Sequence, residues 1–123
     1  MKSNRILICD DEPGVRESLR LILEEEYSLA YAQNGMEAVE QVKAQNPDLA
    51  ILDIKMPQMN GLEALQQIKQ LKPRIRVLII TGYESSDVAR QAANLGADDY
   101  LTKPFDKQKV RAVVQSLLNP EKA

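Results

Sequence analysis

Residues 47–61 read PDLAILDIKMPQMNG and place one acidic residue at the end of an apolar run. Residues 49–52 are apolar at consecutive positions, which is typical of a strand buried on both faces of a parallel sheet. The run stops at Asp53, and Pro57 and Gly61 then indicate a loop before the next helical pattern. Because ligands of open α/β sheets bind at the carboxyl ends of the strands, Asp53 is a candidate functional residue.

The composition is that of an ordinary soluble domain. The 123 residues are 44% hydrophobic and 28% charged, which suits one domain with a buried core. A net charge of -2 provides no basic field for nucleic acid, and no segment reads as a signal peptide or a membrane span. We therefore expect a cytoplasmic protein that contacts neither nucleic acid nor a membrane directly. The absence of His and the single Cys exclude Ser-His triads and zinc sites built from these residues.

The rest of the chain alternates between short apolar runs and amphipathic patterns. The runs predict further strands at residues 5–9, 28–32, 75–80 and 97–101. Apolar residues at helical spacing predict helices at residues 13–26, 35–46, 62–71, 85–94 and 107–118. Strict alternation implies right-handed crossovers, and five units are too few for a closed barrel. The prediction is one α/β domain, residues 1–119, with a doubly wound five-stranded parallel sheet of order 2-1-3-4-5 and a short tail, residues 120–123.

Residues with complementary chemistry gather at the carboxyl ends of these strands. The first strand ends in Asp10 and Asp11, the third in Asp53 and the fourth in Thr81, and Lys103 follows the fifth. Ionising all of these neighbouring carboxylates costs free energy because like charges repel, and Lys103 supplies only one positive charge. We therefore predict that the site binds a hard cation such as Mg²⁺. Such a pocket suits a phosphoryl group. With no His in the chain, a carboxylate is the expected phosphoryl acceptor.

In this order, the motifs resemble the receiver domain of two-component response regulators. They are the acidic pair at residues 10–11, Asp53 followed by MPQMNG, Thr81 after a buried strand, and Lys103-Pro104 before the last helix. The resemblance covers essentially the whole chain and implies the flavodoxin-like, CheY-like (βα)5 fold with a cis Lys-Pro bond. It also implies Mg²⁺-dependent phosphorylation of Asp53 by a phosphohistidine on a sensor histidine kinase or a histidine phosphotransfer protein.

The resemblance assigns the metal ligands by position. Asp10 and Asp11 would hold Mg²⁺ together with Asp53 and the backbone carbonyl of Lys55, and Asp11 is favoured over Asp10 as a direct ligand. Asn60 stands where many receivers have Asp, outside the pocket. Such a domain is not an enzyme for other substrates, because it catalyses only its own phosphorylation and dephosphorylation.

The resemblance also assigns the residues that bind the phosphoryl group and respond to it. Thr81 and Lys103 would contact that group, and Thr81 and Tyr100 would form the switch. Lys55 and Tyr83 would flank the path of water and tune the lifetime of the phosphorylated form. Movement of Tyr100 would change the face made by the fourth helix, the fifth strand and the fifth helix. That face would signal to a downstream protein or effector domain, and dimerisation through it stays open.

Three alternatives remain on the residues alone. A phosphatase of the aspartyl-phosphate type would need a second acid where this chain has Lys55. A flavodoxin-like cofactor binder would need a phosphate loop rich in Ser, Thr or Gly, whereas residues 10–12 (DDE) would repel phosphate. A scaffold that is never phosphorylated is disfavoured by the intact pocket. Outside the pocket, the acidic residues 98–99 are interpreted as solvated charges.

Overall fold

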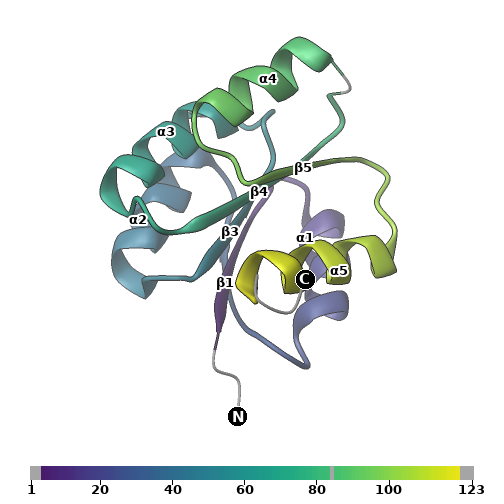
Figure 1. Ribbon diagram of the computed structural model, residues 1–123. Coiled ribbons are helices and arrows are strands. Elements are labelled where there is room, and N and C mark those ends of the chain that lie inside the picture. The colour runs from purple at the N-terminus through teal and green to yellow at the C-terminus, as the bar shows by residue number, and fades with distance from the viewer. Residues whose placement is uncertain (1–3, 84, 120–123) are drawn as a thin grey trace.

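A computed structural model describes residues 4–83 and 85–119 of the chain (Figure 1). The strands are β1 (Arg5–Cys9), β2 (Ser28–Ala32), β3 (Leu49–Leu52), β4 (Arg76–Thr81) and β5 (Asp99–Thr102). The helices are α1 (Pro13–Leu23), α2 (Gly35–Gln45), α3 (Gly61–Leu71), α4 (Ser86–Asn94) and α5 (Lys107–Leu118). All neighbouring strands are parallel, in the order β2-β1-β3-β4-β5. The predicted doubly wound sheet is confirmed.

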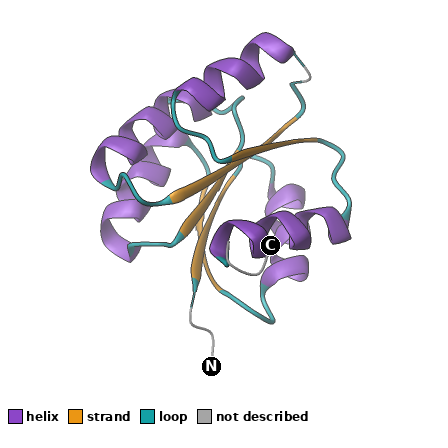
Figure 2. Cartoon of the chain, viewed as in Figure 1, coloured by secondary structure: helices purple, strands orange, loops and turns teal. Residues whose placement is uncertain are grey.

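The sheet separates two hydrophobic cores. Helices α1 and α5 cover one face of the sheet, and α2, α3 and α4 cover the other (Figures 1 and 2). Successive side chains of a strand point to opposite faces, so Ile6 and Ile8 of β1 pack in the core under α1 and α5, and Leu7 and Cys9 pack in the other core. All four residues of β3 are buried. This two-sided burial explains why residues 49–52 are apolar at every position.

One boundary of α1 and one of β5 differ from prediction by two or more residues. Helix α1 ends at Leu23, three residues before the predicted end, and the chain turns there. Strand β5 begins at Asp99, two residues after the predicted start, because the backbone N–H of Ala97 still donates to the carbonyl of Ala92 in α4 (2.9 Å). The predicted tail, residues 120–123, lies outside the described residues.

Asp98 is not the solvated charge that the sequence suggested. Its side chain is 20% exposed, and its Oδ2 accepts hydrogen bonds from Lys69 Nζ (3.1 Å) and from the backbone N–H of Val77 (2.8 Å). Oδ1 lies 3.5 Å from Arg76 Nη1. The carboxylate therefore ties α3 and the first residues of β4 to the loop before β5, a contact between segments that are far apart in the chain.

Candidate functional site

The sheet topology brings together two acidic residues that are 43 positions apart. Strands β1 and β3 are neighbours, and Cys9 pairs with Leu52 at their carboxyl ends. Asp10 and Asp53 are the next residue in each case, and the backbone N–H of Asp53 donates to the carbonyl of Cys9 (3.1 Å). Both aspartates are buried, with 2% and 4% of their surfaces exposed. Two carboxylates are thus held at the point where the strand order reverses.

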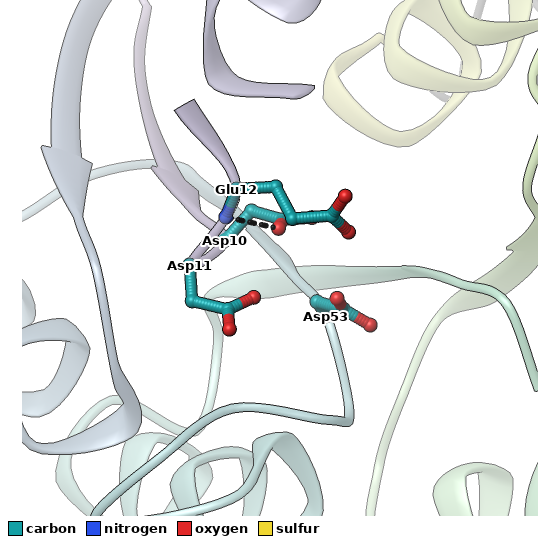
Figure 3. Close-up of side chains that lie close together, drawn as sticks. All are labelled: Asp10, Asp11, Glu12 and Asp53. Carbon is teal, nitrogen blue, oxygen red and sulfur yellow. Dashed lines mark hydrogen bonds between the residues drawn. The ribbon is translucent and has the colours of Figure 1, made fainter. Parts of the chain in front are cut away.

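Four carboxylates form an acidic cluster at this edge, consisting of Asp10, Asp11, Glu12 and Asp53 (Figure 3). One oxygen of each lies within 4.8 Å of the others, although Asp11 and Glu12 are exposed and the other two are buried. The cluster borders an open cavity of about 500 Å³, which we call the acceptor cavity. Its lining residues are Asp11, Glu12, Asp53, Lys55, Thr81, Gly82, Tyr83 and Lys103.

The ammonium group of Lys103 contacts three of these carboxylates. Its Nζ lies 3.0 Å from Oδ2 of Asp10, 3.0 Å from Oδ2 of Asp53 and 3.1 Å from Oε1 of Glu12. The backbone N–H of Lys103 donates to the carbonyl of Thr81 (2.8 Å), which fixes the loop after β5 against the end of β4. The Lys103–Pro104 peptide bond is cis, as the resemblance implied.

The cluster holds more negative than positive charge. Burial raises the pKa of Asp10 above its ordinary value, and repulsion from Asp53 adds to the rise. Burial alone would lower the pKa of Lys103, but its contacts with Asp10, Asp53 and Glu12 outweigh that effect and raise it, so Lys103 is charged at neutral pH. One ammonium group does not balance four carboxylates. The excess charge and the oxygen donors suit a hard divalent cation.

The remaining predicted site residues lie at or beside the acceptor cavity. Thr81 is 1% exposed and lines the cavity at the end of β4, and the exposed residues Lys55 and Tyr83 line its outer part. Tyr100 is not among the lining residues. Its hydroxyl instead donates a hydrogen bond to the backbone carbonyl of Tyr83 (2.8 Å). Tyr100 therefore contacts a residue that lines the cavity but does not line it itself.

Asp53 is held in place by a close approach of backbone segments. The N–H of Gly61 donates to the carbonyl of Ile54 (2.8 Å), and a Cβ atom on Gly61 would lie only 2.0 Å from the carbonyl oxygen of Asp53. Helix α3 can therefore start against Asp53 because Gly61 has no side chain. Asn60 caps this helix by accepting the backbone N–H of Glu63 (3.0 Å), so its side chain has a structural role outside the cavity.

Two residues of the site have contacts that motif reasoning missed. Glu12 touches Lys103, and Arg16 Nη1 donates to the backbone carbonyl of Asp10 (2.7 Å). Glu12 directly follows the acidic pair and could have been included because of its position. Arg16 lies one turn into α1, and its spacing carries no signal that distinguishes it from other surface arginines.

Residues 6–115 match the response regulator receiver domain family. The chain is 38% identical over 117 residues to the chemotaxis protein CheY of Halobacterium salinarum, covering 94% of this chain and 98% of that protein. It is 38% identical over 119 residues to sporulation initiation phosphotransferase F of Bacillus subtilis, covering 96% of each. A chain of the CheX–CheY–BeF3–Mg²⁺ complex from Borrelia burgdorferi superposes with a TM-score of 0.89 at 30% identity, covering 94% of this chain and 90% of that chain.

The fold and the acidic edge of the sheet thus agree with the comparisons. This chain belongs to the receiver domain family of two-component response regulators. None of the described helices is long and apolar enough to cross a membrane.

Proposed function

We propose that Asp53 accepts a phosphoryl group from a phosphohistidine on a sensor histidine kinase or a histidine phosphotransfer protein. The observation that carries this proposal is the 3.0 Å contact between Lys103 Nζ and Oδ2 of a buried Asp53 that borders an open cavity. The chain turns over no other substrate and catalyses only its own phosphorylation and dephosphorylation.

In the transfer, an oxygen of the Asp53 carboxylate attacks phosphorus as the phosphorus–nitrogen bond of the donor breaks. The electron pair of that bond returns to the imidazole ring. Lys103 pairs with the phosphoryl oxygens, and the hydroxyl of Thr81 donates a hydrogen bond to one of them. This assignment is supported by the position of both residues, which line the same cavity as Asp53.

The acidic cluster supports a requirement for Mg²⁺. Asp10, Asp11, Asp53 and the backbone carbonyl of Lys55 would hold the ion, since carboxylate and carbonyl oxygens are its preferred protein ligands. When bound, Mg²⁺ supplies positive charge that offsets the charge of the carboxylates and of the transferred phosphoryl group. The complex from Borrelia burgdorferi is named as containing BeF3 and Mg²⁺, which is consistent with Mg²⁺ binding in a relative.

Phosphorylation would change the surface formed by α4, β5 and α5, and a downstream protein or effector domain would bind to that surface. Thr81 and Tyr100 lie on the adjacent strands β4 and β5, and the contact from Tyr100 to Tyr83 connects that face to the acceptor cavity. A cavity of about 220 Å³ is lined by Tyr100, by three alanines of α4 and by residues 97–99. A change at Thr81 would bias this region toward one of two arrangements that a downstream protein or effector domain distinguishes.

Intact-mass spectrometry after incubation with acetyl phosphate tests the acceptor and the metal together. We expect wild type to gain the mass of one phosphoryl group in the presence of Mg²⁺ and to gain nothing after chelation. Asp53→Asn should gain nothing, whereas Asp48→Asn should behave as wild type. Asp48 is a matched control, because it lies at the opposite end of β3 and is exposed. An adduct that persists in Asp53→Asn would refute the assignment of the acceptor.

A further inference from the structure

Glu12 is the member of the acidic cluster to which the proposed function gives no role. We propose that Glu12 is a specificity-determining residue that makes the acceptor cavity select phosphoryl donors by their net charge and disfavours small dianionic donors. The inference rests on the proposed phosphorylation of Asp53.

The position of Glu12 separates it from the other three carboxylates. Its side chain is 63% exposed, whereas those of Asp10 and Asp53 are 3% and 5% exposed. It nevertheless lines the acceptor cavity, with Oε1 held 3.1 Å from Lys103 Nζ. The backbone of Glu12 is fixed as well, because its N–H donates to Oδ1 of Asp10 (3.0 Å, Figure 3). A donor that enters the cavity therefore passes close to a charge that cannot move far away.

A count of charges shows what Glu12 adds. Lys103, Lys55 and one divalent cation carry four positive charges, which balance the four carboxylates of the loaded cavity. Replacing Glu12 by a neutral residue would leave the loaded cavity with one net positive charge. The repulsion between the charge of Glu12 and a donor scales with the charge of the donor, so losing Glu12 favours the most negative donor most.

Two small donors with different charges can be used to measure how the repulsion from Glu12 depends on the charge of the donor. At neutral pH acetyl phosphate is a dianion, whereas phosphoramidate carries about one net negative charge because its nitrogen is protonated. With acetyl phosphate, a phosphorus–oxygen bond forms at Asp53 as acetate leaves with the electron pair of the bond that breaks. With phosphoramidate, ammonia leaves and keeps the protons it already carries. The acceptor chemistry is the same, so the comparison isolates the charge of the donor.

Two substitutions separate the charge of Glu12 from its contact with Lys103. In Glu12→Gln the amide oxygen can still accept the hydrogen bond from Lys103, but the negative charge is gone. In Glu12→Ala both are lost. Glu25→Gln is the matched control, because Glu25 is exposed and lies just beyond the other end of α1. It removes the same charge from the chain at a site about 16 Å along the helix axis from Glu12.

The experiment measures initial rates of adduct formation by intact mass for the four proteins with both donors. Mg²⁺ affinity is measured separately by calorimetry, so that every rate is compared at saturating Mg²⁺. For Glu12→Gln we expect the acetyl phosphate rate to rise by roughly three- to tenfold and the phosphoramidate rate by about the square root of that factor. The gain should vanish in about 1 M salt, where the Debye length falls to about 3 Å. Glu25→Gln should match wild type.

Several outcomes would overturn the inference. Equal gains for the two donors, or no gain in Glu12→Gln, would show that the charge of Glu12 does not select donors. A gain in Glu12→Ala alone would assign the effect to the contact with Lys103. A loss of Mg²⁺ affinity of more than about tenfold in Glu12→Gln would show that Glu12 acts on the metal site instead of on the donor. If wild type forms no adduct with either small donor, the inference fails. The proposed function fails only if a phosphohistidine protein also leaves Asp53 unmodified.

Discussion

The hydroxyl of Tyr100 donates a hydrogen bond to the backbone carbonyl of Tyr83, with 2.8 Å between the oxygen atoms. Tyr83 borders the acceptor cavity, whereas Tyr100 lies on β5, an edge strand of the sheet. One contact thus connects the wall of the acceptor cavity to the face that is expected to signal. The side chain of Tyr83 and its backbone carbonyl therefore have separable roles, which substitution can distinguish.

Removing the ring of Tyr83 should shorten the life of a phosphorylated Asp53. Tyr83 is 41% exposed and lines the acceptor cavity, so its ring would restrict the approach of water to a phosphorylated Asp53. In Tyr83→Ala we expect the adduct to decay faster by about threefold or more. The decay is followed by intact mass after the donor is removed. Tyr31→Ala is the control, because Tyr31 is 39% exposed but lies on β2. A wild-type decay rate in Tyr83→Ala would exclude this role.

Gly61→Ala should damage both stability and phosphorylation. The new Cβ would lie 2.0 Å from the carbonyl oxygen of Asp53, a backbone atom that cannot rotate away. We expect a loss of about 2 kcal/mol or more in the free energy of unfolding, measured by urea denaturation, together with slower adduct formation. Gly14→Ala is the matched control in α1, where a Cβ would meet nothing within 4 Å. That substitution should leave stability unchanged or raise it by about 0.5–1 kcal/mol.

Asp98→Asn should destabilise the fold without changing the chemistry at Asp53. The substitution keeps the shape of the side chain but removes the charge that pairs with Lys69, whose side chain is only 18% exposed. We expect a loss of about 1–3 kcal/mol, measured by urea denaturation, with an unchanged rate of adduct formation under native conditions. The neighbouring Asp99→Asn should be close to wild type, because Asp99 is exposed. Equal stability of the two variants would contradict a structural role for Asp98.

Asp10→Asn should stabilise the metal-free protein at neutral pH. Burial raises the pKa of Asp10 in the folded state above its unfolded value. Between those two pKa values the folded state binds more protons than the unfolded state, so this group's contribution to stability falls as pH rises. Asn carries no such charge, and Lys103 keeps its contacts with Asp53 and Glu12.

The gain from Asp10→Asn should therefore depend on pH in a defined direction. The difference in unfolding free energy between the variant and wild type should grow as pH rises through the acidic range. At neutral pH the difference should level off in favour of the variant. Urea denaturation in the presence of a chelator measures the difference. A constant difference across that range would mean that Asp10 does not titrate with a raised pKa.

Local patterns were sufficient for most of the fold and for the named site residues. The consecutive apolar residues at 49–52 indicated a buried parallel strand, and alternation of strands with helices predicted a parallel sheet covered by helices on both faces. Errors occurred where a hydrogen bond, rather than hydrophobic periodicity, sets the local structure. The start of β5 depends on a hydrogen bond to the end of α4, and the burial of Asp98 depends on Lys69 of α3. Neither partner can be recognised from the residues next to Asp98 in the chain.

By itself, the sequence determined that carboxylates, a threonine and a lysine follow the carboxyl ends of parallel strands. These positions depend on short-range hydrophobic periodicity and turn residues, which are readable from neighbouring positions. Only the tertiary structure decided which of these groups form ion pairs and hydrogen bonds with one another. The contacts of Lys103 with Glu12 and Asp10, and that of Tyr100 with Tyr83, depend on distances between loops of different crossover units. Such distances are set when the helices pack on the sheet, because no local pattern encodes the space between two loops.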